Sequence, residues 1–348
     1  MSVRKFCTLC MQNASQSALK SAKKFYSSST KLTNTEVRKK RNALFEEEKQ
    51  RQRAAYVKRV EKILVNYKGQ PKDVKLLMNK GISTPYNCAM HINEFLMKRS
   101  IVALVNGELW DIHRPLEEPC DIEFRHMLDQ DPKLPNQVFW RTGAFILGHV
   151  METAFKDNVY VELCSFPPIP VEKGCFVYDV DLKLPDWKPS QRELTSLSMV
   201  GGELWDKNWD FERLEVDASL ALKMFEDNRF KREQIPDIAQ KHKQKRVVLY
   251  RMGEHIDITS GPLIANTSQL YRFQVAQIHH IKSRRFGPLQ RVQGIAMPSA
   301  LHMHWWSWDL LCKRASKPMD YLLPDYFISP SKEPTQQKED NVRAAVEN

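Results

Sequence analysis

The spacing of apolar residues predicts a chain of amphipathic helices and alternating strands. Between 136 and 155, apolar and small residues recur every three or four positions, which is typical of a helix with one buried face. They are Phe139, Gly143, Ile146, Leu147, Val150 and Ala154. We expect Asn136 to be the N-cap of this helix. Arg141, Phe145 and His149 lie four residues apart on a neighbouring face.

A second long helix is predicted near the N-terminus. The stretch 36–67 contains neither glycine nor proline and is rich in helix formers. Its apolar periodicity starts only at Tyr56, so its first half is polar on every side, and such a helix is either solvated or lies against a partner. Its first turns carry a basic cluster, for which a solvated face and an RNA contact are both open: Arg38, Lys39, Lys40 and Arg41.

Residues 72–128 have the pattern of a small α+β unit. The segment 88–98 has helical apolar spacing, and 120–127 alternates as a strand. Between them, 100–112 has the pattern of two strands joined by an Asn-Gly turn. The sequence therefore predicts a hairpin beside a helix, closed by a third strand.

A larger unit is predicted over 129–328. Alternating apolar residues indicate strands at 174–182, on either side of Gly253 within 245–259, and on either side of Gly287-Pro288. The stretch 212–230 is expected to be a helix. We expect the polar tail 329–348 to be disordered.

The net charge of +11 lies in the first 60 residues, which hold 15 Lys and Arg against 4 Asp and Glu. The other 288 residues hold 38 of each, so they can bind an anion only through local patches. Residues 1–35 are basic, serine-rich and free of acid, which is typical of a mitochondrial transit peptide. We expect its cleavage near Phe25–Ser29. A disordered basic tail is the alternative. No apolar run of about 18 residues occurs, and we expect no membrane-spanning helix.

Candidate catalytic residues are sparse. The sequence holds no Walker phosphate loop, no GxGxxG and no G-x-S-x-G elbow. His302 and His304 stand beside three tryptophans, which favours an aromatic packing segment over a metal pair. Asp179 and Asp181 alternate along one strand, where a solvated face is more frequent than a Mg²⁺ site or an acid–base pair. Seven irregularly spaced cysteines suit a reducing compartment.

Two further basic clusters could neutralise phosphates, although scattered surface charge is an equal alternative for each. The first comprises Lys241, Lys243, Lys245 and Arg246, and the second Lys282, Arg284, Arg285 and Arg291.

Five segments, in order along the chain, resemble the first two domains of threonyl-tRNA synthetase. VNGELWD (105–111) is similar to a hairpin of the TGS domain, and GAFILGH (143–149) to the opening helix of the editing domain. GCFVYDVDL, IDITSGPLIAN and LQRVQGIA resemble later strands of that domain. The resemblance implies an α+β fold. A helical arm at 36–71 would precede a ubiquitin-like TGS (β-grasp) unit at 72–128 and an editing-like α/β unit at 129–328.

The editing site of that family has a His-x-x-x-His pair on the helix and Cys-x-x-x-His around a Gly-Pro turn. The matching positions here are Arg141 and Phe145, then Thr259 and Leu263. Zinc takes N, S or O ligands, which Phe and Leu do not offer, and the permanent charge of arginine repels a cation. The resemblance therefore implies that the inherited hydrolysis is lost and that no metal or other cofactor is held.

Segments 78–111 and 261–268 resemble the thirty-ninth-protein family of the mitochondrial large ribosomal subunit. This resemblance implies a non-catalytic structural protein of the mitochondrial matrix, without a small-molecule substrate. Its partners would be large-subunit ribosomal RNA and neighbouring ribosomal proteins. Two alternatives are a freestanding hydrolase of mischarged tRNA and an RNA-binding regulator outside the ribosome.

Overall fold

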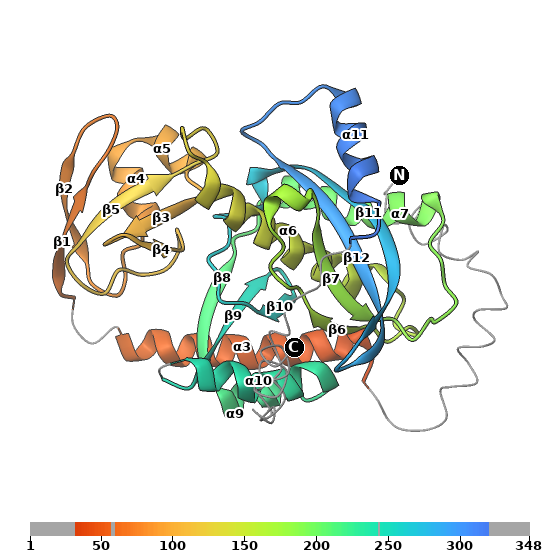
Figure 1. Cartoon of the computed structure of the whole chain (residues 1–348). Helices are drawn as coiled ribbons and strands as arrows, with labels where there is room; N and C mark the ends of the chain where they lie inside the picture. Colours follow the sequence, from red (N-terminus) through yellow and green to blue (C-terminus); the bar gives the residue numbers. More distant parts are fainter. Residues whose placement is uncertain (1–31, 57–59, 243, 320–348) are drawn as a thin grey trace, which may run out of the picture.

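The computed structural model describes residues 32–56, 60–242 and 244–319, which form an α+β fold with three β-sheets (Figure 1). The predicted tail 329–348 and most of the predicted transit peptide lie outside these residues. In the part of the chain that is described, no helix has the length and apolar character needed to cross a lipid bilayer.

The first sheet has five strands in the order β2-β1-β5-β3-β4. The strands are β1 (Lys62–Tyr67), β2 (Val74–Asn79), β3 (Val102–Val105), β4 (Glu108–Trp110) and β5 (Cys120–Arg125). β1 and β5 pair in parallel and all other neighbours are antiparallel, which is the ubiquitin-like arrangement. The predicted Asn-Gly turn joins β3 to β4 because Asn106 and Gly107 both take positive φ angles, of 50° and 84°.

Two short helices accompany this sheet, where the sequence predicted one helix over 88–98. They are α4 (Pro85–Ile92) and α5 (Glu94–Arg99). Asn93 separates them because its extended backbone ends α4 while its side chain accepts a hydrogen bond from Phe95 N at 2.7 Å.

The larger unit is built around α6 (Lys133–Ala154), which contacts two antiparallel sheets (Figure 1). One sheet has the order β11-β12-β7-β6, with β6 (Glu162–Ser165), β7 (Phe176–Asp181), β11 (Leu270–Ser283) and β12 (Gly287–Pro298). The other has the order β10-β9-β8, with β8 (Glu212–Asp217), β9 (Arg246–Met252) and β10 (His255–Ile258). The remaining elements are η2 (Val171–Lys173), α7 (Gln191–Gly202), α8 (Leu204–Lys207), α9 (Ala218–Met224), α10 (Arg229–Lys241), η3 (Thr267–Gln269) and α11 (Trp305–Ala315).

Glycine allows α6 to approach the sheet closely. A Cβ atom at Gly143 would stand 2.4 Å from the ring of Phe176 on β7, and one at Gly148 would stand 2.7 Å from the ring of Tyr178. The predicted apolar face of this helix is confirmed by burial of Phe139, Ile146, Leu147 and Val150. Its start is not, because α6 begins at Lys133 after Pro132, and Asn136 lies inside the helix.

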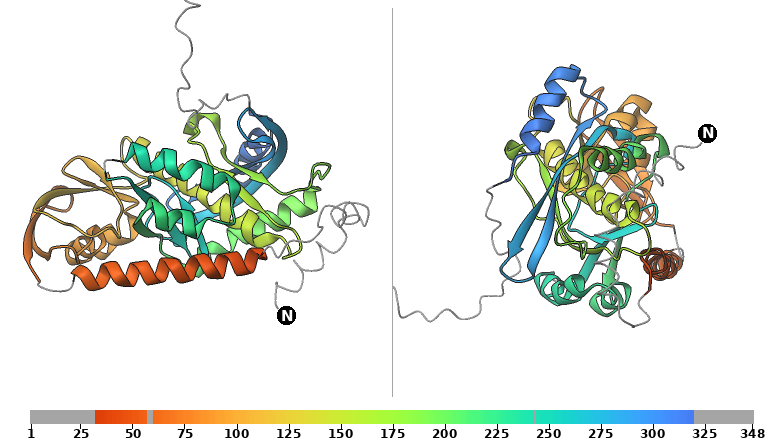
Figure 2. Two further views of the ribbon diagram at one scale, coloured as in Figure 1. Left: turned by 90° about the horizontal axis from the view of Figure 1, so that it is seen from below. Right: turned by 90° about the vertical axis from the view of Figure 1, so that its right-hand side faces the viewer.

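The N-terminal helix α3 (Asn34–Tyr56) lies along the larger unit, as the left view of Figure 2, seen from below, shows. Val37, Arg41, Phe45 and Glu48 are buried and share one side of the helix because they are three or four residues apart. Phe45 is fully buried in the core that β8, β9, α9 and α10 form. The expectation that the first half of this helix is solvated or lies against a partner is therefore wrong, because one side of it packs against the core of the same chain.

Two predicted helical stretches contain strands. Residues 62–67 form β1, so the helix of the predicted arm 36–71 ends already at Tyr56. Residues 212–217 form β8 inside the predicted helix 212–230, and α9 follows only at Ala218. Both strands alternate buried and more exposed side chains, and β-branched Ile63, Val65 and Val216 suit that geometry.

The start of α3 overlaps the last two residues of the predicted transit peptide, 34 and 35. Asn34 donates a hydrogen bond to Val159 O at 2.7 Å and accepts one from Val161 N at 3.2 Å. Thr35 Oγ1 donates to Asp157 at 2.8 Å. Residues 34 and 35 thus belong to the folded body, while the predicted cleavage near Phe25–Ser29 lies outside the described residues.

Candidate functional site

The four positions that correspond to the editing ligands lie near one another but hold no ligand set. Phe145 is fully buried and its ring packs edge-to-face against those of Phe166 and Phe211. Leu263 is also buried, and its N–H donates to Asp111 at 3.1 Å. Both side chains have become part of the core, which excludes them from metal chemistry.

Arg141 and Thr259 face a pocket instead. Arg141 Nη1 donates to the carbonyl oxygens of Gly261 and Pro262, the latter at 3.1 Å. Thr259 Oγ1 accepts a hydrogen bond from Gly261 N at 3.4 Å. The guanidinium therefore fastens α6 to the turn after β10, and burial lowers the pKa of Arg141 below its usual value.

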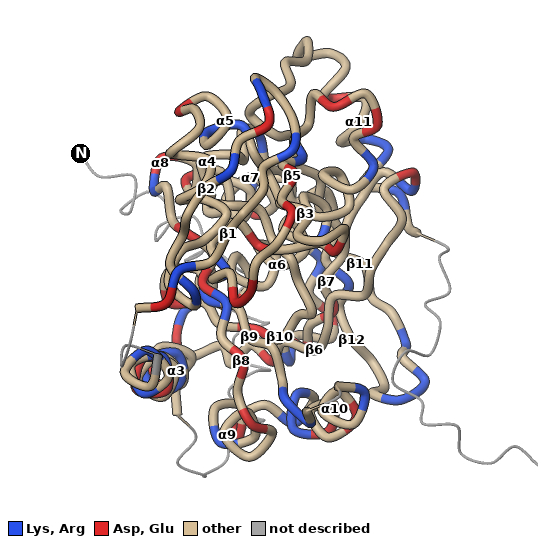
Figure 3. The backbone as a smooth tube through the Cα atoms, turned by 90° about the vertical axis from the view of Figure 1, so that its left-hand side faces the viewer, with Lys and Arg blue, Asp and Glu red and all other residues tan. Residues whose placement is uncertain are grey.

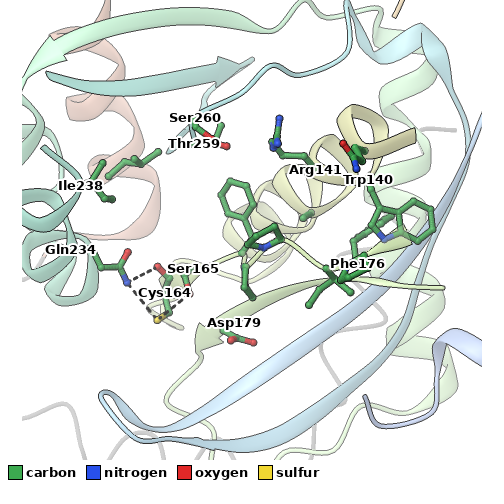
Figure 4. Close-up of a pocket in the computed structure, with 18 of the residues that line it drawn as sticks. Trp140, Arg141, Cys164, Ser165, Phe176, Asp179, Gln234, Ile238, Thr259 and Ser260 are labelled. Carbon is green, nitrogen blue, oxygen red and sulfur yellow. Dashed lines mark hydrogen bonds between the residues drawn. The ribbon is translucent and has the colours of Figure 1, made fainter. Parts of the chain in front are cut away.

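The pocket has a volume of about 1190 Å³, and residues that are far apart in the sequence line it (Figure 4). Its walls come from the first half of α6, the segment 164–172, α10, the ends of β9 and β10, and the β11–β12 hairpin. In Figure 4, Arg141, Thr259 and Ser260 lie on one side, across from Cys164, Ser165 and Gln234. No local sequence pattern indicates this cavity, because its lining residues lie up to 158 positions apart, from Asp131 to Leu289.

The reactive groups of the pocket are already engaged. Burial raises the pKa of the Cys164 thiol to about 12, so it is not a thiolate at neutral pH. Asp179 accepts two hydrogen bonds from Arg291, each of 2.8 Å, and both side chains are buried. Lys231 is ion-paired with the fully buried Asp257. No cluster of three or more His, Cys, Asp or Glu residues that could hold a metal ion occurs among the described residues.

Asp179 and Asp181 are a correction to the expected solvated strand face. Both are buried because β7 is an inner strand, with β12 and β6 on its two sides and α6 packed against it. Asp181 pairs with Lys183 and Arg229. The two carboxylates serve separate ion pairs and do not form one acid–base site.

Three of the four side chains in the first basic cluster bind other residues of the same chain. Arg41 donates to Glu152 at 3.0 Å and to Ile256 O at 3.2 Å, and both charged side chains are buried. Arg38 donates to Glu152 O at 2.6 Å, and Lys40 pairs with Glu226 and Asp227. Lys39 is exposed. Figure 3, in which α3 is seen end-on, shows that this helix carries both acidic and basic residues.

The other basic candidates divide into buried pairs and exposed cations. Arg291 is bound to Asp179, and Arg285 pairs with Glu233 and Asp237. The exposed members are Lys245, Arg246, Lys282 and Arg284, while Lys243 lies outside the described residues. Arg246 and Arg284 both line the large pocket. We therefore withdraw the buried Arg41 and Arg291 as RNA contacts and retain the exposed residues as a proposal.

A second feature that sequence reasoning missed is an exposed aromatic surface, which we call the α11 surface. Trp305 and Trp306 are 67% and 60% exposed, and large apolar neighbours are also exposed: Trp205, Tyr271, Leu301, Met303 and Leu310. The expected packing role holds for Trp308, which contacts the core beneath the helix. Exposed apolar surface of this kind marks an interaction site.

The fold defines a protein with a TGS domain followed by a synthetase-like α/β body. The family model described as "TGS domain" matches residues 63–125. The human protein "Threonine--tRNA ligase 2, cytoplasmic" is 32% identical over 64% of this chain and 26% of its own length. The bovine "Threonine--tRNA ligase 1, cytoplasmic" is 31% identical over 64% of this chain and 29% of its own. The chain thus spans between a quarter and a third of these ligases.

A relative of matching length defines the family. The Drosophila melanogaster protein "Large ribosomal subunit protein mL39" is 41% identical to this chain over 288 residues. The match covers 82% of this chain and 86% of that protein. The chain belongs to the mL39 family.

Proposed function

We propose that the chain is a non-catalytic structural component of the large subunit of the mitochondrial ribosome. The observation that carries the proposal is the 41% identity to a large-subunit ribosomal protein along 86% of that protein's length. The acid-free, basic start of the sequence supports import into mitochondria, where the ribosome lies in the matrix. The buried Phe145 and Leu263 support the loss of the inherited hydrolysis.

The proposed partners are neighbouring ribosomal proteins and ribosomal RNA. The α11 surface suits a protein neighbour, because buried tryptophans dominate the energy of many protein interfaces. The exposed Lys39, Lys245, Lys282 and Arg284 suit phosphate contacts that position RNA without reading its sequence.

Sedimentation of mitochondrial lysate on a sucrose gradient tests the assignment. We expect the tagged chain to sediment with the large subunit, and a chain found only in the slow, free fractions would refute the proposal. Trp305→Ala with Trp306→Ala should lower the bound fraction, since a buried interface tryptophan contributes about 2 kcal/mol or more. The matched control is Phe95→Ala, which removes an aromatic side chain of similar exposure (62%) from α5.

The hydrolase alternative is tested on the purified chain with mischarged tRNA. We expect no deacylation above that of buffer, with or without added Zn²⁺, because the side chains of Phe145 and Leu263 offer no ligand atom. Metal-dependent turnover would overturn the non-catalytic assignment.

A further inference from the structure

The strand β2 forms an open edge of the five-stranded sheet in the TGS domain. It is the last strand in the order β2-β1-β5-β3-β4, and Figure 1 shows it on the side of the sheet that faces away from the larger unit. Lys80 N donates to Glu61 O at 2.9 Å, and the antiparallel register continues without a break along both strands. Because backbone groups alternate in direction along a strand, those of Lys75 and Leu77 face away from β1.

The outward backbone groups of Lys75 and Leu77 are not covered by any described residue. The next outward residue, Asn79, is covered by the turn that follows β2: its N–H donates to Ser83 Oγ at 3.0 Å, and its carbonyl accepts from Ser83 N at 2.9 Å. In the described part of the chain no such bond reaches Lys75 or Leu77, and Leu77 is 67% exposed. Each of the two residues therefore offers one N–H donor and one C=O acceptor, which is the pattern that an added strand pairs with.

An exposed apolar pair lies on the sheet face beside this edge. Leu64 of β1 and Leu77 of β2 stand directly opposite each other, and Leu64 is 44% exposed. The alternate residues Ile63, Val65 and Met78 point to the other face of the sheet and are buried. A strand added at the edge would place its own side chains next to Leu77, so backbone pairing and apolar burial would act together.

The charge of the β1–β2 hairpin indicates the kind of strand that fits. Residues 61–80 hold five lysines and two acidic residues. Lys68 and Lys80 are paired with nearby carboxylates, whereas Lys72 and Lys75 are exposed and form no ion pair with a described residue. Edge-to-edge pairing of two copies of this chain would bring like charges together, which is unfavourable, whereas acidic side chains on the added strand would complement the lysines.

The free carbonyls favour a polypeptide over RNA as the partner of this edge. The phosphates of RNA accept hydrogen bonds but donate none, so they would leave the carbonyls of Lys75 and Leu77 unpaired. They would also leave the two leucines uncovered. An extended polypeptide satisfies N–H and C=O groups alike and brings apolar side chains to the adjoining face.

We propose that an extended segment of a neighbouring protein pairs with β2 as a sixth strand of this sheet, with an apolar residue beside Leu77 and an acidic residue beside Lys75. This proposal rests on the ribosomal role proposed above, because the neighbour is a protein of the same large subunit. It adds a protein contact on the TGS domain that is separate from the α11 surface.

Site-specific photo-crosslinking in isolated large subunits tests the proposal. The tagged full chain carries p-benzoylphenylalanine in place of Leu64, and mass spectrometry identifies what is attached after irradiation. We expect a segment of another ribosomal protein. The same crosslinker in place of Leu128, which is 61% exposed in the turn before α6, should not capture that segment. Capture of RNA alone, of a second copy of this chain or of nothing would overturn the proposal and leave cosedimentation as it is. Absence of the chain from the large subunit would refute both proposals.

A proline at position 77 separates strand pairing from simple contact. Leu77→Pro removes an N–H that faces away from β1, so the β1–β2 ladder keeps its hydrogen bonds. The crosslink yield from position 64 should fall about 5-fold or more, because a backbone hydrogen bond is lost and the ring obstructs the added strand. Leu77→Val is the matched control, since it keeps the N–H and an apolar side chain, and it should crosslink as the unchanged chain does. Equal yields in the two variants would refute strand addition.

A charge reversal provides a second test if Leu77→Pro fails to fold. Lys75→Glu should also lower the crosslink yield several-fold, because it opposes the acidic side chain expected on the added strand. The matched control is Lys156→Glu, which makes the same change at an exposed position beyond the end of α6 and should have no effect. Equal yields in Lys75→Glu and Lys156→Glu would contradict the proposed partner.

Discussion

His149 makes the stability of the fold depend on pH near neutrality. It lies on α6 and is 5% exposed. The centre of its ring is 6.1 Å from the ring centre of Trp209 and 5.9 Å from that of His255. Its Nδ1 has no hydrogen-bond partner among the described residues. Burial, and then the neighbouring His255, lower the pKa of His149 from 6.5 to about 3. The folded chain therefore keeps this imidazole neutral at pH values where the unfolded chain protonates it.

The magnitude follows from these two pKa values. Below pH 6.5 the unfolded chain binds a proton that the folded chain does not, so the free energy of unfolding falls as the pH falls. Between pH 7 and pH 5 the loss from His149 is about 2 kcal/mol. The loss is nearly the same for any folded pKa below about 4, because the unfolded state alone titrates in this window. Glu152 stays ionised throughout, since its folded pKa is lowered to about 2.

His149→Phe isolates this contribution because phenylalanine fills a similar volume and does not titrate. We expect urea unfolding followed by circular dichroism to show a loss between pH 7 and pH 5 that is about 2 kcal/mol smaller in His149→Phe than in the unchanged chain. His91→Phe is the matched control, since His91 is exposed on α4 and should leave the pH dependence as it is. If His149→Phe loses as much stability on acidification as the unchanged chain, His149 is not held neutral in the folded state.

Two further predictions concern packing and use the same denaturation experiment at pH 7. Arg41→Met should cost about 3–5 kcal/mol because it leaves the Glu152 carboxylate buried without its arginine. Arg51→Met, which removes an exposed arginine from the same helix, should cost less than about 1 kcal/mol. Equal costs would contradict docking of α3 through the Arg41–Glu152 ion pair. Gly143→Ala should cost about 1–3 kcal/mol because the added Cβ meets an aromatic ring at 2.4 Å, whereas Gly202→Ala, with nothing within 4 Å, should stabilise the chain by up to about 1 kcal/mol. A stabilising Gly143→Ala would refute the close approach of α6 to the sheet.

The sequence predicted best those elements whose pattern is local. The Asn-Gly hairpin follows from the two residues that accept positive φ, and the buried face of α6 follows from helical spacing. The stretches 62–67 and 212–217 were predicted as helix because helix formers surround their apolar residues. Pairing with distant strands, β5 and β9, decides their structure, and that pairing has no local signal.

Charge patterns alone did not separate structural cations from exposed ones. Arg41 lies in a dense basic cluster, yet it is buried against Glu152, 111 positions away. Arg291 was grouped with Arg284, but a buried aspartate holds the first and the second is exposed at the pocket. The partner of a cation depends on which elements the fold brings together, so a basic run predicts an anion site only after the internal ion pairs are known.

The side chains at the four positions that the resemblance matches to editing ligands help to stabilise the core of the larger unit. In a metal site the ligands face a cavity that must stay open, and their polar atoms are satisfied by the ion. Phe145 closes that space with aromatic packing, and Leu263 adds a second apolar side chain to the same core. Arg141 instead ties α6 to the turn at Gly261 and keeps part of its guanidinium toward the pocket. Three of these four side chains therefore pack into or brace the frame, and the fourth, Thr259, accepts a hydrogen bond within the same turn. A histidine at Phe145 or Leu263 would be a buried imidazole without an ion to satisfy it, so the apolar side chains at these two positions stabilise this core better than histidine would.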